Sequence, residues 1–118
     1  MKVMSFNCRG LAGPYKKSTF KRVLTLERPD VILLQETLGV GYIIKDRLES
    51  WLVGWTFVTL DVRRRSDGLA VGWKNSEMKL INSWGMDYVL GVEVLFVDLG
   101  INLSVINIYR PYLNRIPF

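Results

Sequence analysis

The sequence contains no histidine and only one cysteine, Cys8. Without imidazole there is no histidine general base and no histidine-ligated zinc, and one thiol completes neither a zinc site nor an intramolecular disulfide. A secreted disulfide scaffold is therefore excluded, and a reducing compartment is expected. Any chemistry must run on carboxylates, amides, hydroxyls and cations, and any metal should be a hard, oxygen-binding ion such as Mg²⁺, Mn²⁺ or Ca²⁺.

Long apolar runs are also missing, and acidic residues are few. No apolar run approaches the roughly 20 residues of a membrane span, and Arg9 interrupts the start before a signal-peptide core could form. We therefore expect an intracellular chain, nuclear or cytoplasmic, with no membrane partner. The chain has 11 acidic residues against 16 lysines and arginines. Residues 1–28 hold seven of these cations and only one acid, Glu27, which favours phosphate-bearing partners.

The length of 118 residues, with 49% hydrophobic and 23% charged residues, is typical of one folded domain. A short apolar-rich segment at residues 2–8 predicts a strand that ends near Asn7. Helical spacing of apolar residues over 16–28 predicts an amphipathic helix with a basic outer side, ended by Pro29. The continuous apolar run 31–34 predicts a strand covered on both faces. Strand, helix and strand within about 30 residues indicate a βαβ unit.

The rest of the sequence predicts a second helix from Gly41 to Leu52, followed by strands. Five short β-rich runs separated by turn residues follow it, at 55–60, 69–73, 78–84, 89–97 and 103–109. We expect them to form an antiparallel meander joined to the first sheet. Cys8 and the four tryptophans, Trp51, Trp55, Trp73 and Trp84, are expected in the core. Two helices cover only one face of such an apolar sheet, so the chain is predicted to be half of a layered α/β fold.

Polar residues stand at the ends of the first two predicted strands. If these strands are parallel neighbours, their carboxyl ends share one edge of the sheet, where α/β proteins bind ligands. This topology brings Asn7 and Glu36 together although they are 36 − 7 = 29 positions apart. A carboxylate there keeps its charge when it is solvated, paired or holding a cation. Glu36 and Asn7 therefore form either a metal site or an ordinary polar loop that caps the strand.

Two further segments could meet a phosphate. The turn Arg63–Gly68 is basic, with Arg65 and Ser66 near a flexible tip, and Tyr109-Arg110-Pro111-Tyr112 ends the last predicted strand. We take Arg9, Arg65, Ser66 and Arg110 as candidate phosphate or nucleic-acid contacts. The alternatives are a solvated hairpin loop for the first segment and an aromatic packing corner with an exposed arginine for the second.

Four segments together resemble the successive amino-terminal motifs of the endonuclease/exonuclease/phosphatase superfamily. They are Met4–Leu11, Pro29–Thr37, Ser66–Trp73 and Asn107–Pro111. The opening Asn-Cys-Arg-Gly-Leu and the Gln-Glu-Thr are most similar to the endonuclease domain of plant LINE-type (non-long-terminal-repeat) retrotransposons. The resemblance implies a truncated deoxyribonuclease I-like layered α/β (α+β) sandwich, with a mixed sheet carrying two helices on one face. Residues 1–118 would be the amino-terminal portion of a single domain.

The resemblance also implies a chemistry: a Mg²⁺- or Mn²⁺-dependent phosphodiesterase with DNA as partner. Glu36 matches the family's metal-binding glutamate, Asn7 the asparagine that supports the metal and the scissile phosphate, and Tyr109 the tyrosine at the rim of the active site. Asp67 stands where relatives often carry glycine. The family's Gly-Asp-x-Asn and Ser-Asp-His motifs do not occur in these 118 residues. Half of the active site is thus missing, and we expect this chain alone to be inactive or nearly so.

The favoured parent activity is the nicking of DNA by a retrotransposon-type endonuclease. One alternative is a superfamily phosphatase acting on a sugar phosphate, a phosphoinositide or an RNA end. Another is a non-catalytic domesticated remnant that binds nucleic acid or a protein through its basic first helix. An uncovered sheet face on the strands between residues 69 and 109 would also favour self-association.

Overall fold

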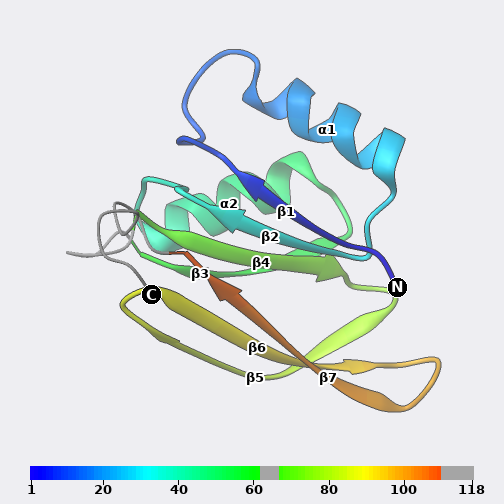
Figure 1. The fold of residues 1–118 in the computed structure, drawn as a ribbon. Coiled ribbons are helices and arrows are strands. Elements are labelled where there is room, and N and C mark those ends of the chain that lie inside the picture. The colour runs from blue at the N-terminus through cyan, green and yellow to red at the C-terminus, as the bar shows by residue number, and fades with distance from the viewer. Residues whose placement is uncertain (62–66, 110–118) are drawn as a thin grey trace, which may run out of the picture.

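The computed structural model describes residues 1–61 and 67–109. The elements in chain order are β1 (Val3–Asn7), α1 (Lys16–Glu27), β2 (Val31–Gln35), α2 (Gly41–Trp51), β3 (Trp55–Leu60), β4 (Leu69–Lys74), β5 (Met78–Met86), β6 (Val89–Phe96) and β7 (Ile101–Ile108) (Figure 1). Neither described helix has the length and apolar character that a bilayer crossing requires.

The strands form two sheets. The first has the order β1-β2-β4-β3, with β1 and β2 parallel and the other pairs antiparallel. The predicted βαβ unit and mixed sheet are therefore confirmed. The second sheet is antiparallel with the order β5-β6-β7. The expected antiparallel meander is confirmed for these three strands, but the expectation that it joins the first sheet is wrong, because the strands leave that sheet after β4 and stack on its face.

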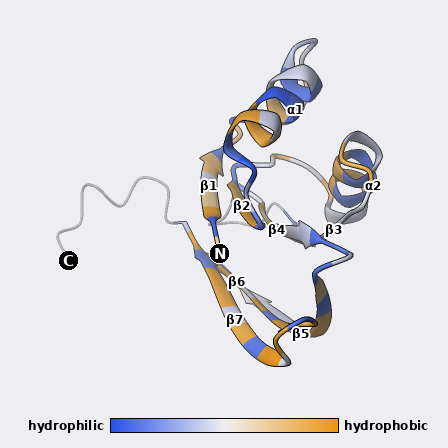
Figure 2. Cartoon of the chain, turned by 90° about the vertical axis from the view of Figure 1, so that its right-hand side faces the viewer, coloured by the Kyte–Doolittle hydropathy of each residue, from blue (hydrophilic) through white to orange (hydrophobic). Residues whose placement is uncertain are grey.

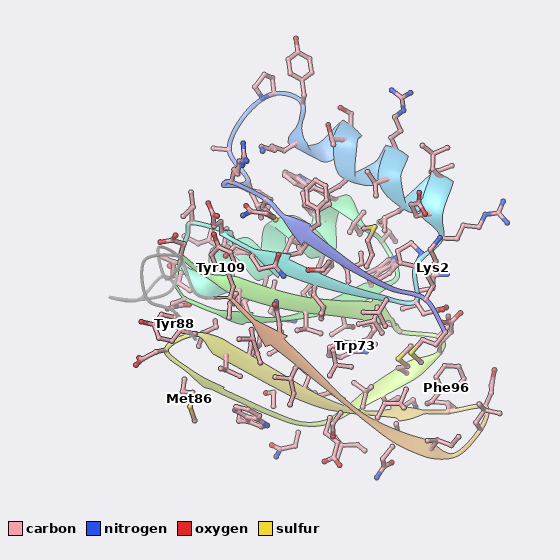
Figure 3. All side chains as sticks on the ribbon, viewed as in Figure 1. Lys2, Trp73, Met86, Tyr88, Phe96 and Tyr109 are labelled. Carbon is pink, nitrogen blue, oxygen red and sulfur yellow. The ribbon has the colours of Figure 1, made fainter. Side chains whose placement is uncertain are left out.

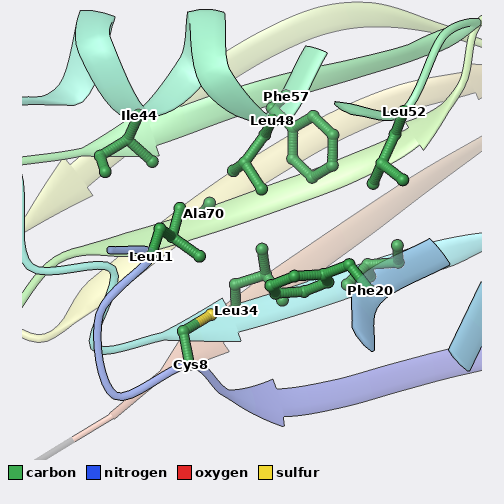
Figure 4. Close-up of a cluster of buried hydrophobic side chains, with 10 residues drawn as sticks. Cys8, Leu11, Phe20, Leu34, Ile44, Leu48, Leu52, Phe57 and Ala70 are labelled. Atoms are coloured by element: carbon green, nitrogen blue, oxygen red, sulfur yellow. The ribbon is translucent and has the colours of Figure 1, made fainter. Parts of the chain in front are cut away.

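Both faces of the first sheet are buried. Helices α1 and α2 cover one face, where Phe20 of α1 and Ile44 and Leu48 of α2 pack with Leu34 and Phe57 (Figure 4). The second sheet covers the other face. Its inward residues on β6 are Leu90, Val92 and Val94, which pack with residues of β2, β3 and β4. The layers are thus helices, mixed sheet and antiparallel sheet (Figure 2). This is a deoxyribonuclease I-like α/β sandwich with two helices on one face.

The outer face of the second sheet has no cover from the described part of the chain (Figure 2). Apolar side chains stand on it, namely Trp84, Met86, Ile106 and Ile108, which are 46–63% exposed. The expectation that Trp84 lies in the core is therefore wrong. Trp84 pairs with Gly91, and on this face its ring occupies the space that a side chain at Gly91 would fill. Trp73 and Cys8 are buried as predicted, and Trp51 and Trp55 pack against the core from its margin.

The end of α1 carries local signals that place β2 correctly. Arg28 adopts a left-handed conformation with φ +48°, and its amide donates to the carbonyl of Leu24, which closes the last turn. Pro29 then prevents the helix from continuing. Asp30 ties this turn to the start of β1, because its Oδ2 accepts a hydrogen bond from the amide of Lys2 at 2.7 Å. The crossover therefore returns β2 beside β1 with Asn7 opposite Gln35.

Candidate active site

Three polar side chains from different strands converge at one edge of the sandwich. Asn7 ends β1, Glu36 follows β2 directly, and Tyr109 follows β7. The Nδ2 of Asn7 donates a hydrogen bond to Oε2 of Glu36 at 2.6 Å, and the hydroxyl of Tyr109 donates to the same oxygen. Figure 3 shows Tyr109 at the end of the molecule where β1 and β2 finish. The structure thus places all three predicted residues in contact.

The turns that carry Asn7 and Glu36 are strained. Arg9, Glu36 and Leu38 have φ values of +50°, +54° and +53°. For residues other than glycine this left-handed region costs roughly 1–2 kcal/mol each. Such strain persists where surrounding contacts impose it, and it is common at functional sites. Here it turns the chain sharply after each strand, so that the side chain of Glu36 projects at the end of the sheet.

Backbone hydrogen bonds hold these two turns together. The amide of Cys8 donates to the carbonyl of Gln35 at 2.8 Å, and the amide of Gly10 donates to the carbonyl of Glu36 at 2.7 Å. The amide of Leu38 donates to the carbonyl of Asp67 at 2.8 Å, which attaches the same segment to the start of β4. The loops after β1 and β2 and the residues before β4 therefore form one connected edge.

The hydrogen bonds favour the ionised form of Glu36. The bond from Tyr109, then the bond from Asn7, and finally the charge of Arg9 hold the pKa of Glu36 below its ordinary value, while partial burial opposes them. The same bond to Glu36, together with burial, raises the pKa of Tyr109. At neutral pH the site therefore presents a carboxylate beside a protonated phenol. Both hydrogen bonds end on Oε2, and no described residue donates to Oε1.

The donor set suits a hard divalent cation. Mg²⁺ binds through one or two carboxylates and keeps several waters, which leaves room for substrate phosphate. Within residues 1–61 and 67–109, no three His, Cys, Asp or Glu side chains gather to hold a metal ion. Glu36 therefore belongs to no closed cage of side chains in the described chain, and its carboxylate fits Mg²⁺ or Mn²⁺, which keep several waters. The amide nitrogen of Asn7 faces Glu36, and its Oδ1 accepts from the amide of Arg9 at 3.0 Å. In this arrangement Asn7 orients the carboxylate, and its role as a metal ligand stays a prediction.

The other predicted phosphate contacts divide into two groups. Arg9 lies beside the site and its charge acts on Glu36. Arg65, Ser66 and Arg110 lie outside the described residues. Asp67 lies near Tyr109, and its charge contributes to raising the pKa of that phenol.

One residue that supports the site was not found from the sequence. Asn107 is 1% exposed, and its Nδ2 donates to the carbonyls of Leu34 and Ala70 at 2.9 and 3.0 Å. Its Oδ1 accepts from Nε2 of Gln35 at 3.0 Å. Asn107 therefore fastens β7 to β2 and β4 of the first sheet, two residues before Tyr109. The sequence does contain a signal for this role, because Asn107 is a polar residue at an inward position of a strand whose other inward residues are apolar.

The fold is similar to that of several solved enzymes. The human Nocturnin catalytic domain with bound sulfate matches with a TM-score of 0.70 and 16% identity over 98% of this chain and 52% of that one. The AP endonuclease LMAP from Leishmania major gives a TM-score of 0.67 and 21% identity over 92% and 39%. D. rerio TDP2 complexed with single strand DNA product gives 0.66 and 20% over 90% and 44%. No curated protein matches the sequence.

The chain thus spans about half, or less, of the length of these structures, and at such identities the likeness is one of fold. The family assignment comes from the sequence itself. The model of the Endonuclease/Exonuclease/phosphatase family matches residues 4–102, which is most of the chain. The chain therefore belongs to the endonuclease/exonuclease/phosphatase family.

Proposed function

We propose that this chain carries the metal-binding part of a Mg²⁺-dependent phosphodiesterase site. The observation that supports it is the convergence of two donors, from β1 and from the end of β7, on one carboxylate oxygen of Glu36. These donors stabilise the anion without adding a competing cation, so the carboxylate stays available to Mg²⁺ or Mn²⁺. A bound ion of this kind polarises a phosphoryl oxygen. Asn7 orients the carboxylate and reaches the scissile phosphate, while Tyr109 and Arg9 stand at the rim.

The substrate proposed for the parent protein is DNA, which it nicks as a LINE-type retrotransposon endonuclease. In residues 1–28 the basic side chains outnumber the acidic ones, which supports a phosphate-rich partner. The segments Asn7–Leu11 and Gln35–Thr37 support the retrotransposon origin through their resemblance to the plant proteins. Among the similar structures, one is titled an AP endonuclease and another contains a single strand DNA product. An intracellular location is part of this proposal.

We also propose that these 118 residues are the amino-terminal portion of one domain and turn over little or no substrate alone. In-line attack needs an activated water and a stabilised leaving oxygen besides the metal. The sequence has no histidine, and within the described residues no further carboxylates gather around Glu36 to hold a metal. The exposed apolar outer face of the second sheet supports the same view, because it would favour self-association of the chain by itself.

A plasmid-nicking assay tests this proposal. We expect the full chain with Mg²⁺ to convert no more supercoiled plasmid than a chelator control does. Mg²⁺-dependent nicking that Glu36→Ala abolishes, and that Glu93→Gln on the outer face of β6 leaves intact, would show that the site is complete. The claim of inactivity would then be wrong, although the role given to Glu36 would stand.

A nucleic-acid-binding module is the second candidate function. Lys17, Lys21 and Arg22 are placed on α1, where Lys17 and Lys21 are exposed, and this basic surface could bind phosphates without any metal. This function predicts DNA affinity that falls steeply with salt and is unchanged by chelator or by Glu36→Ala. Affinity that depends on Mg²⁺ and on Glu36 would instead favour the phosphodiesterase site.

A further inference from the structure

A groove of about 460 Å³ lies beside the candidate active site, between the loop after β1 and the first turns of α2. Its lining is largely apolar and includes Leu11, Leu38, Val40 and Ile43. Arg9 and Arg47 are its two charged residues, and no acidic side chain of the described chain lines it. The groove therefore combines positive charge with an apolar floor.

The groove is continuous with the site. Arg9 and Gly10 follow Asn7 in the chain, and Thr37 and Leu38 follow Glu36, so the segments that present the two site residues also form the groove wall. The hydrogen bond from the amide of Gly10 to the carbonyl of Glu36 joins these segments. A polymer with one phosphate at Glu36 would therefore place its neighbouring units in the groove.

The opposite wall is fixed in place. The amide of Gly41, the first residue of α2, donates to Oδ1 of Asp61 at 2.6 Å. The carbonyl of Gly41 accepts from the hydroxyl of Thr59 at 3.0 Å. These two bonds anchor the start of α2 to the end of β3. A ligand would meet a preformed groove and would not have to order this wall.

The exposed apolar side chains indicate what the groove binds. Leu38, Val40 and Ile43 are 51%, 48% and 43% exposed, although they lie next to cations. An anionic ligand with flat apolar faces satisfies both features, and a nucleic acid strand has them when its bases are unpaired. In a duplex the base faces are stacked on one another and are not available to such a floor.

We propose that this groove binds single-stranded nucleic acid next to the scissile phosphate, with Arg47 contacting a backbone phosphate and the apolar floor contacting an unpaired base. This deepens the proposed phosphodiesterase function, on which the position of the scissile phosphate rests. The affinity of the groove itself requires no metal.

The test measures fluorescence anisotropy of a short labelled DNA strand with the full chain in EDTA. We expect the single strand to bind more tightly than a duplex of the same sequence. Arg47→Glu should weaken binding at least about fivefold and reduce the salt slope by roughly 0.7, the contribution of one phosphate contact on a single strand. Lys79→Glu makes the same charge change at an exposed position of β5 and should alter the affinity less than about twofold.

A second variant tests the apolar floor. Ile43→Asn should weaken the binding of the normal strand but not of an abasic strand, which has the same phosphates and no bases. Three results would each overturn the proposal. They are equal losses with Arg47→Glu and Lys79→Glu, equal affinity for strand and duplex, and undiminished binding of the abasic strand by the native chain. Because these measurements exclude metal, they are independent of the role given to Glu36, which metal-binding experiments test separately.

Discussion

The buried amide of Asn107 should be the main polar connection between the two sheets. Replacing it with leucine keeps a side chain of comparable length but removes three hydrogen bonds, to the carbonyls of Leu34 and Ala70 and from Gln35. Gln35 keeps its bond to the hydroxyl of Ser5 at 2.9 Å, so the two carbonyls bear most of the loss.

The magnitude follows from the number of bonds. Three bonds at roughly 0.5–1.5 kcal/mol each give about 1.5–4.5 kcal/mol of lost unfolding free energy. We therefore expect Asn107→Leu to lower the free energy of unfolding by about 2–4 kcal/mol, a large fraction of the roughly 5–15 kcal/mol that stabilises a typical domain. Tyr109 should lose its fixed position, so that its raised pKa returns toward 10.0.

Equilibrium urea unfolding, followed by tryptophan fluorescence, measures this loss. Asn102→Leu is the matched control, because Asn102 is exposed on the same strand, and its effect should stay within about 0.5 kcal/mol. A loss below about 0.5 kcal/mol for Asn107→Leu, or equal losses for both variants, would refute the idea that this amide fastens β7 to the first sheet.

Three further predictions concern single side chains. Tyr109→Phe should raise the pKa of Glu36 in a carbon-detected NMR titration. The lowered pKa of Glu36 stabilises the native fold at pH values above the ordinary 4.5, and this stabilisation is lost as the pH falls through the folded-state pKa. The variant should therefore lose less stability on acidification. Burial raises the pKa of the Cys8 thiol to about 12. The native thiol should therefore be unreactive toward a disulfide reagent at pH 8 and react fully in urea. The stability that the buried neutral thiol contributes should be lost as the pH rises from 9.0 toward 12. Trp84→Lys should change the free energy of unfolding by less than about 1 kcal/mol and increase the monomer fraction in sedimentation velocity; an unchanged oligomer distribution would contradict self-association through this face.

The sequence was sufficient to predict the local structure and the proximity of two site residues, Asn7 and Glu36. The period of apolar residues located both helices, and the βαβ proportion implied parallel strands, which placed Asn7 next to Glu36. Tyr109 was identified only through resemblance, because no local rule relates the end of the seventh strand to the end of the second.

Other features depended on contacts that periodicity does not encode. Alternation in β5–β7 shows which residues share a face, but it does not say whether these strands extend the first sheet or stack on it. Trp84 was expected in the core because it sits within an apolar run, but it lies on the outer face. The role of Asn107 is equally non-local, since its partners Leu34 and Ala70 are 73 and 37 positions away.

The central claim is that Glu36 binds a divalent cation at the edge where Asn7 and Tyr109 meet. Substoichiometric Mn²⁺ added to the isotopically labelled chain tests it most directly, because the ion broadens NMR signals only near its site. We predict selective broadening of the Asn7 side-chain amide and of the amides of Arg9 and Thr37, reversed by excess Mg²⁺, absent in Glu36→Gln and retained in Glu93→Gln. Broadening that persists in Glu36→Gln, or that is spread over acidic residues elsewhere, would contradict the account.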